Sequence, residues 1–348
     1  MTRYPRTIGI DLGSRKSACC TLRPDGEIEV ESTMTTSRQS FEGFFAEEPT
    51  SRVILEACGV SRWVAQIAES HGHEVIVANP RRLALITSST RKSDRNDAYK
   101  LADLGQVRPR LLHPIHRRGE RSHLAQIHLR VRSQLVQSRT ALGNCIRGCA
   151  RTTGHPMPKC STQVFPKRCR ERLPEGLLEL LLPLIEQIES LNRQIAACNE
   201  RSERIAEEHF SETGCLRQVP GVGPVLSLAF AASIEDASRF KSSRSVGAYF
   251  GLAPRSRQSG SKAPQLRISK RGDPELRRLL VSAATYILGP FGPDSDLKRY
   301  GKRITSSGSQ SARAKARIAV ARKLAVLLHR LWTTGEVYRP LNKEQATA

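Results

Sequence analysis

Two aspartates stand three residues apart in the segment RKSDRNDAYKLADLGQ, residues 91–106, in a run that is otherwise mostly basic. Residues three apart are neighbours on one face of a helix, so Asp94 and Asp97 can act together. Two further acids close apolar, strand-like runs: Asp11 in IGIDLG and Glu56 in VILEACG. Burying an acidic side chain at the end of a strand costs free energy, so such a residue usually has a charged partner or a functional role. The four carboxylates are therefore candidates for shared chemistry.

Four carboxylates at one point cannot all stay ionised unless a cation neutralises them. Their oxygens suit Mg²⁺ or Mn²⁺, and two such ions can stabilise the attacking and leaving oxygens when a phosphodiester is cut. A simpler interpretation also stands for the pair in the basic segment. Ser93 or Asp94 can cap a helix that begins there, and Asp97 then lies in the first turn, where the helix dipole favours an acid.

The elements that must position these acids follow from the periodicity of the first 110 residues. Apolar or alternating runs predict strands, and amphipathic runs predict helices between them. The predicted strands cover 6–13, 17–22, 27–33, 52–58 and 74–80, and the helices cover 37–48, 60–72 and the sequence after Pro80. Three strands followed by alternating helix and strand is the order of RNase H-like domains. We therefore predict an α/β RNase H-like (RuvC-like) domain over residues 1–110, with the strands of Asp11 and Glu56 adjacent.

Residues 111–212 form a predicted α-helical, coiled-coil region, interrupted over 154–174 by a Pro- and Cys-containing stretch expected to be a loop or arm tip. From 120 to 150 one apolar stripe is expected to be buried: Leu124, Ile127, Val131, Leu135, Leu142 and Cys149. From 177 to 205 apolar residues recur at spacings of four and three, which is a heptad seam. That seam can belong to a helix bundle or to a coiled coil that oligomerises, and both interpretations stay open.

Residues 213–348 form the third predicted domain, mainly α-helical. Its first segment, LRQVPGVGPVLSLAFAA over 216–232, has the pattern of a helix-hairpin-helix. Backbone amides of the turn at Gly221 and Gly223, at a helix N-terminus, can bind a phosphate without reading sequence. The alternative is a plain turn between two helices.

The charge of the chain is concentrated in its second part. The formal net charge is +23, of which residues 1–110 carry +2 and the remainder +21. An excess of this size indicates binding to nucleic acid. No apolar run approaches the roughly 20 residues of a membrane span, so no membrane partner is expected. The nine cysteines are odd in number and form no CxxC pair, which favours a reducing cytoplasm over a disulfide framework or a zinc ribbon.

Three parts of the sequence together resemble the insertion-sequence 110 family of transposases and the related Piv/MooV-type DNA invertases. They are IGIDLGSRKSA with VILEACG, then RKSDRNDAYKLADL, then VPGVGP with AYFGLAPRSRQSGSKAPQLRISKRGDPELRRLLV. The resemblance runs from about residue 7 to about residue 335. It implies a RuvC-like DEDD domain whose four acids correspond to Asp11, Glu56, Asp94 and Asp97. It also implies a C-terminal transposase domain with a nucleophilic serine.

The family's serine precedes a glycine between YFGLAP and RISKRG, which here is Ser259 in the loop 254–272. The flanking residues depart from the family's pattern, so Ser256 and Ser261 stay open. A serine hydroxyl needs a base or a metal to become a nucleophile. Cationic side chains around it can hold the scissile phosphate and spread transition-state charge: Arg255, Arg257, Lys262, Arg267, Lys270 and Arg271. A serine–phosphate bond conserves energy, so strands can be rejoined without ATP.

The resemblance further implies a homo-oligomer, a dimer or tetramer, in which the acids of one subunit meet the serine of another. In some members a structured non-coding RNA, the bridge RNA, pairs with donor and target DNA. The expected protein is thus a prokaryotic, cytoplasmic DNA recombinase that is nucleoid-associated when active.

Three other interpretations compete with the recombinase. One is a RuvC-like nuclease or Holliday junction resolvase in which Ser259 is only structural, and another is a non-catalytic nucleic-acid-binding protein. The run IGIDLGSRKSA also resembles the first phosphate loop of actin-like ATPases. That fold needs a second Asp–Gly loop, whereas ADLGQ over 102–106 lies in a helical pattern.

Overall fold

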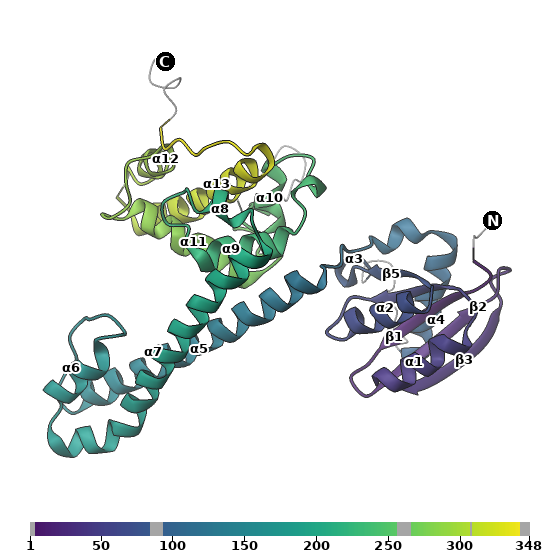
Figure 1. The fold of residues 1–348 in the computed structure, drawn as a ribbon, viewed down its shortest axis with the longest axis horizontal. Coiled ribbons are helices and arrows are strands. Elements are labelled where there is room, and N and C mark those ends of the chain that lie inside the picture. Colours follow the sequence, from purple (N-terminus) through teal and green to yellow (C-terminus); the bar gives the residue numbers. More distant parts are fainter. Residues whose placement is uncertain (1–3, 84–92, 256–265, 307, 342–348) are drawn as a thin grey trace. The chain divides into compact units, whose positions relative to one another are not determined.

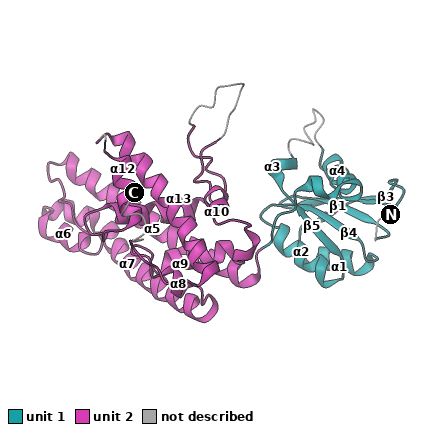
Figure 2. Cartoon of the chain, turned by 90° about the horizontal axis from the view of Figure 1, so that it is seen from above, with its two compact units in different colours: residues 1–117 teal, residues 118–348 magenta. Residues whose placement is uncertain are grey.

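A computed structural model describes the chain over residues 4–83, 93–255, 266–306 and 308–341 (Figure 1). The chain divides into two units, residues 1–117 and residues 118–348 (Figure 2). Within the described ranges, none of the helices combines the length and the apolar character that crossing a bilayer requires.

A mixed five-stranded sheet forms the centre of the first unit, in the order β3-β2-β1-β4-β5. Its strands are β1 (Thr7–Leu12), β2 (Lys16–Leu22), β3 (Ile28–Thr35), β4 (Arg52–Glu56) and β5 (Glu74–Ala78). The pairs β1–β2 and β2–β3 are antiparallel, and the pairs β1–β4 and β4–β5 are parallel. The predicted α/β domain at the N-terminus is confirmed, and this sheet is compatible with an RNase H-like fold.

Helices cover both faces of this sheet. On one face, α1 (Arg38–Glu47) and α2 (Ser61–Ser70) bury Phe41, Phe45 and Val64 against apolar residues that include Ile8 and Ile10 of β1. On the other face, α4 (Asp94–Val107) packs on β1, β2 and β4. The short α3 (Pro80–Leu83) and a 3₁₀ turn (Pro109–Leu112) complete the unit. The central strands are thus buried on both sides, and α4 covers the second face at β1.

Two long helices, α5 (Glu120–Thr152) and α7 (Glu175–His209), pack against each other in the second unit (Figure 1). Several residues of the predicted heptad seam are buried on α7, among them Leu181, Ile188 and Leu191. The seam therefore packs within the chain, as a helix bundle requires, and an oligomerising coiled coil stays a prediction.

Two expectations for this region are wrong in part. The stretch 154–174 contains a helix, α6 (Phe165–Arg172), whose Phe165 and Cys169 are buried against α5 and α7. On α5 the expected stripe is exposed at Leu124 (56%), Ile127 (45%) and Val131 (51%). In the first half of α5 the buried residues are instead mostly small: Ser122, Ala125, Leu129 and Ser133. Small side chains on α5 allow α7 and α9 to pack close to it. The positions of the apolar residues alone therefore do not predict which face of α5 is buried.

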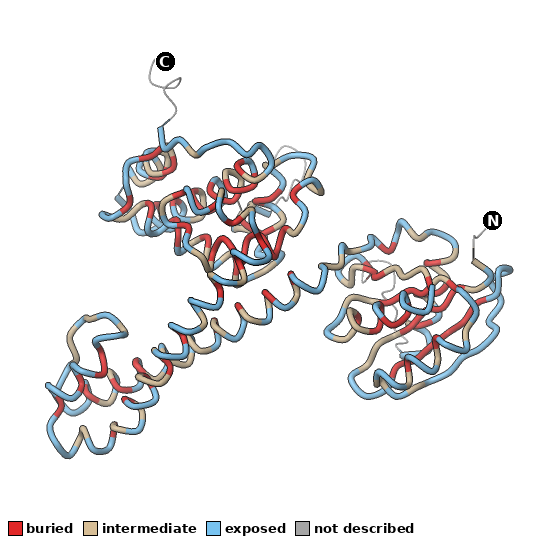
Figure 3. The backbone as a smooth tube through the Cα atoms, viewed as in Figure 1, coloured by how far each residue is buried: buried red, intermediate tan, exposed pale blue. Residues whose placement is uncertain are grey.

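A helical bundle forms the rest of the second unit. Its helices are α8 (Thr213–Leu216), α9 (Pro224–Ile234), α10 (Arg244–Tyr249), α11 (Pro274–Leu288), α12 (Asp296–Ile304) and α13 (Gln310–Thr334), with a 3₁₀ turn at Ala237–Arg239. Every residue of α9 from Leu226 to Ile234 is buried, as the tube in Figure 3 shows. A helix that is apolar all round belongs at the centre of a bundle. The predicted mostly helical region after the sheet is confirmed.

Candidate active site

Asp11 and Glu56 lie on neighbouring parallel strands. The pairing of β1 with β4 runs up to Ile10 and Leu55, and the two acids are the next residues on each strand. Side chains alternate between the two faces of a sheet. Asp11 therefore lies on the same face as Gly9, two residues earlier, which is the face that α4 covers. Topology and register together bring two of the four predicted acids to one edge of one face.

The first turn of α4 supplies the other two acids, Asp94 and Asp97. The helix is capped by Ser93, whose Oγ accepts a hydrogen bond from the backbone N–H of Asn96 at 3.2 Å. Of the two predicted caps, Ser93 is thus the one used, and both aspartates keep their carboxylates for other partners. Asp97 pairs with Lys100 Nζ at 3.3 Å, and its side chain stays 39% exposed.

Gly9 sets the distance between α4 and the sheet. A Cβ built on Gly9 would overlap the backbone carbonyl oxygen of Ala98 and crowd the backbone of Ala102. Further along α4, a Cβ on Gly105 would overlap the side chain of Ile54 of β4. Backbone therefore packs directly on backbone at the helix turn that follows Asp94 and Asp97. Sequence analysis missed Gly9, although a glycine inside an apolar strand is the usual signal for a close backbone approach.

The four carboxylates share one electrostatic environment. Burial, and then the charges of Asp94, Asp97 and Glu56, raise the pKa of Asp11 from its ordinary 3.8 to about 6. Burial and the charge of Asp97 raise the pKa of Glu56 as well. Like charges shift one another in this way only when they lie close together in a poorly solvated place. The charges of Asp94, Asp97 and Glu56 therefore act on Asp11, and that of Asp97 acts on Glu56. A common site for the four acids stays a prediction.

The donors at this place are all carboxylate oxygens, the ligands that Mg²⁺ and Mn²⁺ prefer. Within the described residues, no three of the chain's His, Cys, Asp and Glu side chains converge closely enough to hold an ion in common. Asp97 is paired with Lys100. The chemistry of the donor set and the raised pKa of Asp11 fit a divalent cation.

Because no side chain can occupy the contact at Gly9, replacing Gly9 with alanine is expected to push α4 away from β1. A displacement near 1 Å costs about a hundredfold in catalysis, so any catalysis that depends on the four acids should fall by about that factor in Gly9→Ala. The pKa of Asp11, followed by NMR, should fall toward its ordinary value as the other acids move off. Gly43→Ala in α1, where an added Cβ meets nothing within 4 Å, is the matched control. Unchanged cleavage by Gly9→Ala would contradict this account of α4.

Metal binding to these acids is expected to weaken below pH 6. A carboxylate binds a metal ion in its deprotonated form, so protons compete with Mg²⁺ below the Asp11 pKa of about 6. The apparent Mg²⁺ affinity should fall by about tenfold per pH unit below that value and level off above it. Calorimetric titration of Mg²⁺ between about pH 5 and about pH 8 measures this. An affinity that does not change across that range would show that Asp11 is not a ligand.

The predicted serine loop begins and ends on a described hairpin stem in the second unit. The backbone N–H of Arg255 donates to the carbonyl of Arg267 at 3.0 Å, and that of Ser269 donates to Ala253 at 2.8 Å. Pro254 and Ile268 form an antiparallel bridge between these pairs. The loop residues Ser256, Arg257, Ser259, Ser261 and Lys262 lie outside the described residues. The stem places exposed Arg255 and Arg267 at the two ends of that loop.

The base of this stem is held by backbone contacts that leave little freedom. Gly251 has φ +71° and Gly272 has φ +78°, and a Cβ on either would overlap backbone of the facing segment. Arg277 of α11 donates from Nη1 to the carbonyls of Phe250 (3.0 Å) and Arg271 (3.1 Å). Sequence analysis did not single out Arg277, although it lies in the segment GDPELRRLLV that ends the third part of the family resemblance.

Two of the predicted phosphate ligands lie at this base. Lys270 and Arg271 are exposed, and Lys270 takes the left-handed backbone conformation at φ +54°. A lysine in that conformation costs free energy, which the surrounding contacts must offset. The stem therefore presents cations next to the predicted serine loop from a rigid support.

The predicted helix-hairpin-helix spans α8, a turn, and α9. Gly221 and Gly223 are exposed, Gly221 has φ +91°, and Gly223 is the N-cap of α9. A Cβ on Gly221 would crowd Tyr286 of α11, so a glycine is required there. The first helix has only four residues. Phosphate binding by this turn stays a prediction.

Comparison with known proteins adds to this geometry. Residues 214–300 match the family described as "Transposase IS116/IS110/IS902 family", and residues 8–154 match the DEDD transposase domain of IS110-type elements. Both predicted sites therefore fall in matched segments, the four acids in the second match and the serine loop in the first.

Three relatives match nearly the whole chain. The transposase for insertion sequence element IS1111A of Coxiella burnetii is 29% identical over 96% of this chain and 91% of its own length. The transposase for IS1328 of Yersinia enterocolitica is 27% identical over 95% of this chain and 98% of its own length. The pilin gene-inverting protein of Moraxella bovis is 25% identical over 92% of this chain and 93% of its own length.

Proposed function

The chain belongs to the IS110 family of insertion-sequence transposases, and on that premise we propose that it cuts and rejoins DNA through a covalent serine–DNA intermediate. The cut is assisted by a divalent cation at Asp11, Glu56, Asp94 and Asp97. The observation that carries the proposal is the surroundings of Asp11, where burial and then the charges of the other three acids raise its pKa to about 6. Sheet order, register and the close packing of α4 all contribute to it.

The acids and the serine have different tasks in this proposal. The four carboxylates would hold Mg²⁺ or Mn²⁺, which would supply positive charge to the oxygens of the reacting phosphate. The Oγ of Ser259 loses its proton, forms a bond to phosphorus, and displaces a deoxyribose oxygen that takes up a proton. Because one phosphoester bond replaces another, the reverse step can join a new strand without an external energy source.

The hairpin stem supports this assignment of Ser259. Arg255 and Arg267 stand where the loop leaves and re-enters the described chain, and Lys270 and Arg271 lie at its base. Guanidinium groups bind phosphate oxygens in a bidentate way and stay charged at any working pH. Together with Arg257 and Lys262 of the loop itself, they are the proposed ligands of the scissile phosphate.

The partners proposed for the protein are donor DNA, target DNA and a structured guide RNA. The net charge of +21 beyond residue 110 supports a large phosphate-binding surface, which binds by charge and does not by itself read sequence. Base pairing by the guide RNA would then choose the target. The amides of Gly221 and Gly223 are a further proposed phosphate contact, and a homo-oligomer is the proposed assembly.

A suicide DNA substrate tests the proposal. A nick placed beside the scissile phosphate lets the cut end diffuse away, so a protein–DNA adduct accumulates and can be isolated on a denaturing gel. We expect a Mg²⁺-dependent adduct, and mass spectrometry of the digested protein should place the modification on Ser259. Cleavage that yields free ends and no adduct would instead support a RuvC-like nuclease or junction resolvase.

The guide RNA is tested separately, by purifying the protein with its bound nucleic acid and sequencing the RNA. One discrete, structured RNA encoded beside the gene is the expected result. Random cellular fragments would show that binding follows charge alone.

A further inference from the structure

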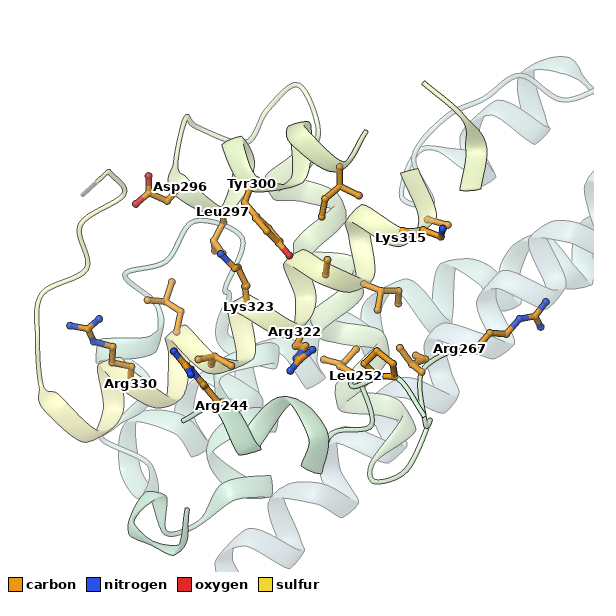
Figure 4. Close-up of a pocket in the computed structure, with 18 of the residues that line it drawn as sticks. Arg244, Leu252, Arg267, Asp296, Leu297, Tyr300, Lys315, Arg322, Lys323 and Arg330 are labelled. Carbon is orange, nitrogen blue, oxygen red and sulfur yellow. The ribbon is translucent and has the colours of Figure 1, made fainter. Parts of the chain in front are cut away.

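A large groove lies beside the hairpin stem, between the stem, α12 and α13 (Figure 4). Its volume is about 1280 Å³, which exceeds the roughly 300–1,000 Å³ that is typical of small-molecule pockets. Pro254, Arg267 and Ile268 of the stem form part of its wall. A ligand bound in this groove therefore contacts the stem from which the predicted serine loop extends.

The rim of the groove is strongly cationic. Six basic residues outside the stem line it: Arg244, Lys315, Arg322, Lys323, Arg330 and Arg339. Among its described lining residues, Asp296 is the single carboxylate. A rim of this charge selects an anionic polymer over a neutral or a cationic one.

The floor of the groove is apolar and carries an aromatic ring. Ile318, Val326 and Leu327 of α13 are only partly buried there, and Ile304 of α12 faces the same space. Tyr300 of α12 is partly exposed, and Lys323 Nζ lies 3.9 Å from the centre of its ring. An occupant must therefore offer apolar faces to the floor as well as negative charge to the rim.

We propose that this groove binds an unpaired segment of nucleic acid, with bases on the floor and phosphates on the rim. A duplex turns its base faces inward and would leave the floor uncovered, whereas a single strand exposes both bases and phosphates. The inference goes beyond strand cutting and rests on the proposed function only in taking nucleic acid as the partner. A strand held here is delivered unpaired to the hairpin that carries Ser259.

Binding of short oligonucleotides to the full-length protein tests this, with EDTA present so that no strand is cut. The probes are oligothymidylate, oligouridylate and a duplex of equal length, followed by fluorescence anisotropy. The groove variant Lys315→Glu/Lys323→Glu should bind the single strands at least about tenfold more weakly. Arg313→Glu/Arg317→Glu is the matched control, because these exposed arginines lie on the same helix but do not line the groove. Its affinity for the single strands should change by less than about threefold.

A second pair of variants tests the floor without changing charge. Tyr300→Leu should weaken single-strand binding by at least about fivefold and leave the duplex unaffected, because base stacking is lost. Tyr300→Phe keeps the ring and should bind as the wild type does. The two single-stranded probes show whether the site prefers DNA or RNA.

Each contrary result has its own meaning. Equal losses in both charge-reversed pairs, or a loss for the duplex as large as for the single strands, overturn the groove proposal and leave the proposed function standing. An acidic helical peptide serves as a further probe. The groove proposal is also overturned if Lys315→Glu/Lys323→Glu weakens binding of this peptide and leaves binding of the oligonucleotides unchanged. Failure of the wild type to bind any nucleic acid would overturn the proposed function as well.

Discussion

Asp11→Asn is expected to abolish DNA cleavage and, in the same protein, to raise the stability of the metal-free fold. The loss of cleavage should be at least about a thousandfold, because the substitution removes a metal ligand and its charge from the reacting centre. The gain in stability follows from the raised pKa of Asp11, about 6 in the folded chain against an ordinary 3.8. Above pH 6 the folded protein holds an ionised carboxylate that its surroundings disfavour.

The size of this gain in stability depends on pH. Between pH 3.8 and pH 6 the folded state binds more protons at Asp11 than the unfolded state does. The contribution of Asp11 to stability therefore falls as pH rises through this window. At about pH 7.5, asparagine should stabilise the fold by about 1–2 kcal/mol, a figure discounted because Asp11 is partly exposed. At about pH 3.5 the two proteins should be nearly equal in stability.

Thermal unfolding with and without Mg²⁺ measures the change in stability, and a DNA cleavage assay of the same two proteins measures the loss of activity. Mg²⁺ should stabilise the wild type and leave Asp11→Asn unchanged, since a ligand stabilises only the state that binds it. Asp103→Asn is the matched control, because Asp103 lies on α4 but is not among the charges that raise the pKa of Asp11. An Asp11→Asn protein that is less stable than the wild type at pH 7.5 would contradict the proposed crowding of the acids.

Ser259→Ala is expected to remove the covalent protein–DNA adduct and strand rejoining completely, while binding to DNA stays within about threefold of wild type. Alanine offers no oxygen for the bond to phosphorus, and the cations of the hairpin remain in place to hold the phosphate. The neighbouring variants Ser256→Ala and Ser261→Ala, in the same loop, should keep the adduct. They are the matched controls for a change of loop conformation.

Crossing this variant with Asp11→Asn separates the two sites. If the acids and the serine act in one step, the double variant should lose no more activity than either single variant. An adduct that persists in Ser259→Ala but disappears in Ser256→Ala or Ser261→Ala would move the nucleophile to that residue. If Ser259→Ala still cleaves DNA and forms no adduct, the protein is a nuclease that cuts by hydrolysis, and the serine mechanism is wrong.

The sequence was informative about the acids because each of them interrupts a pattern. Asp11 and Glu56 stand at the ends of apolar strands, and Asp94 and Asp97 have helical spacing. In the structure the strand order places Asp11 and Glu56 on neighbouring strands, and the charges of Asp94 and Asp97 on α4 act on Asp11. The predicted identity of the nucleophile came from resemblance alone, because one serine among several in a polar loop breaks no pattern.

The sequence was less informative where backbone makes the contact. The closeness of α4 to β1 depends on Gly9 and Ala98, and the hairpin base depends on carbonyl oxygens that Arg277 binds. Neither contact follows from apolar periodicity, which reports side chains. The prediction of a buried stripe at Leu124 and Val131 of α5 is wrong for a related reason, since small residues line the buried face.

The contact at Gly9 also has a consequence for how the protein changes over evolutionary time. Where two side chains pack together, a larger residue at one position can be compensated by a smaller residue at the other. The carbonyl of Ala98 and the backbone at Ala102 are present whatever the side chain, so no substitution there can make room for a larger residue at Gly9. A larger residue at Gly9 would meet this backbone and could be accommodated only by moving the whole helix. We therefore expect position 9 to stay glycine in related sequences even where the side chains of the surrounding core have been replaced.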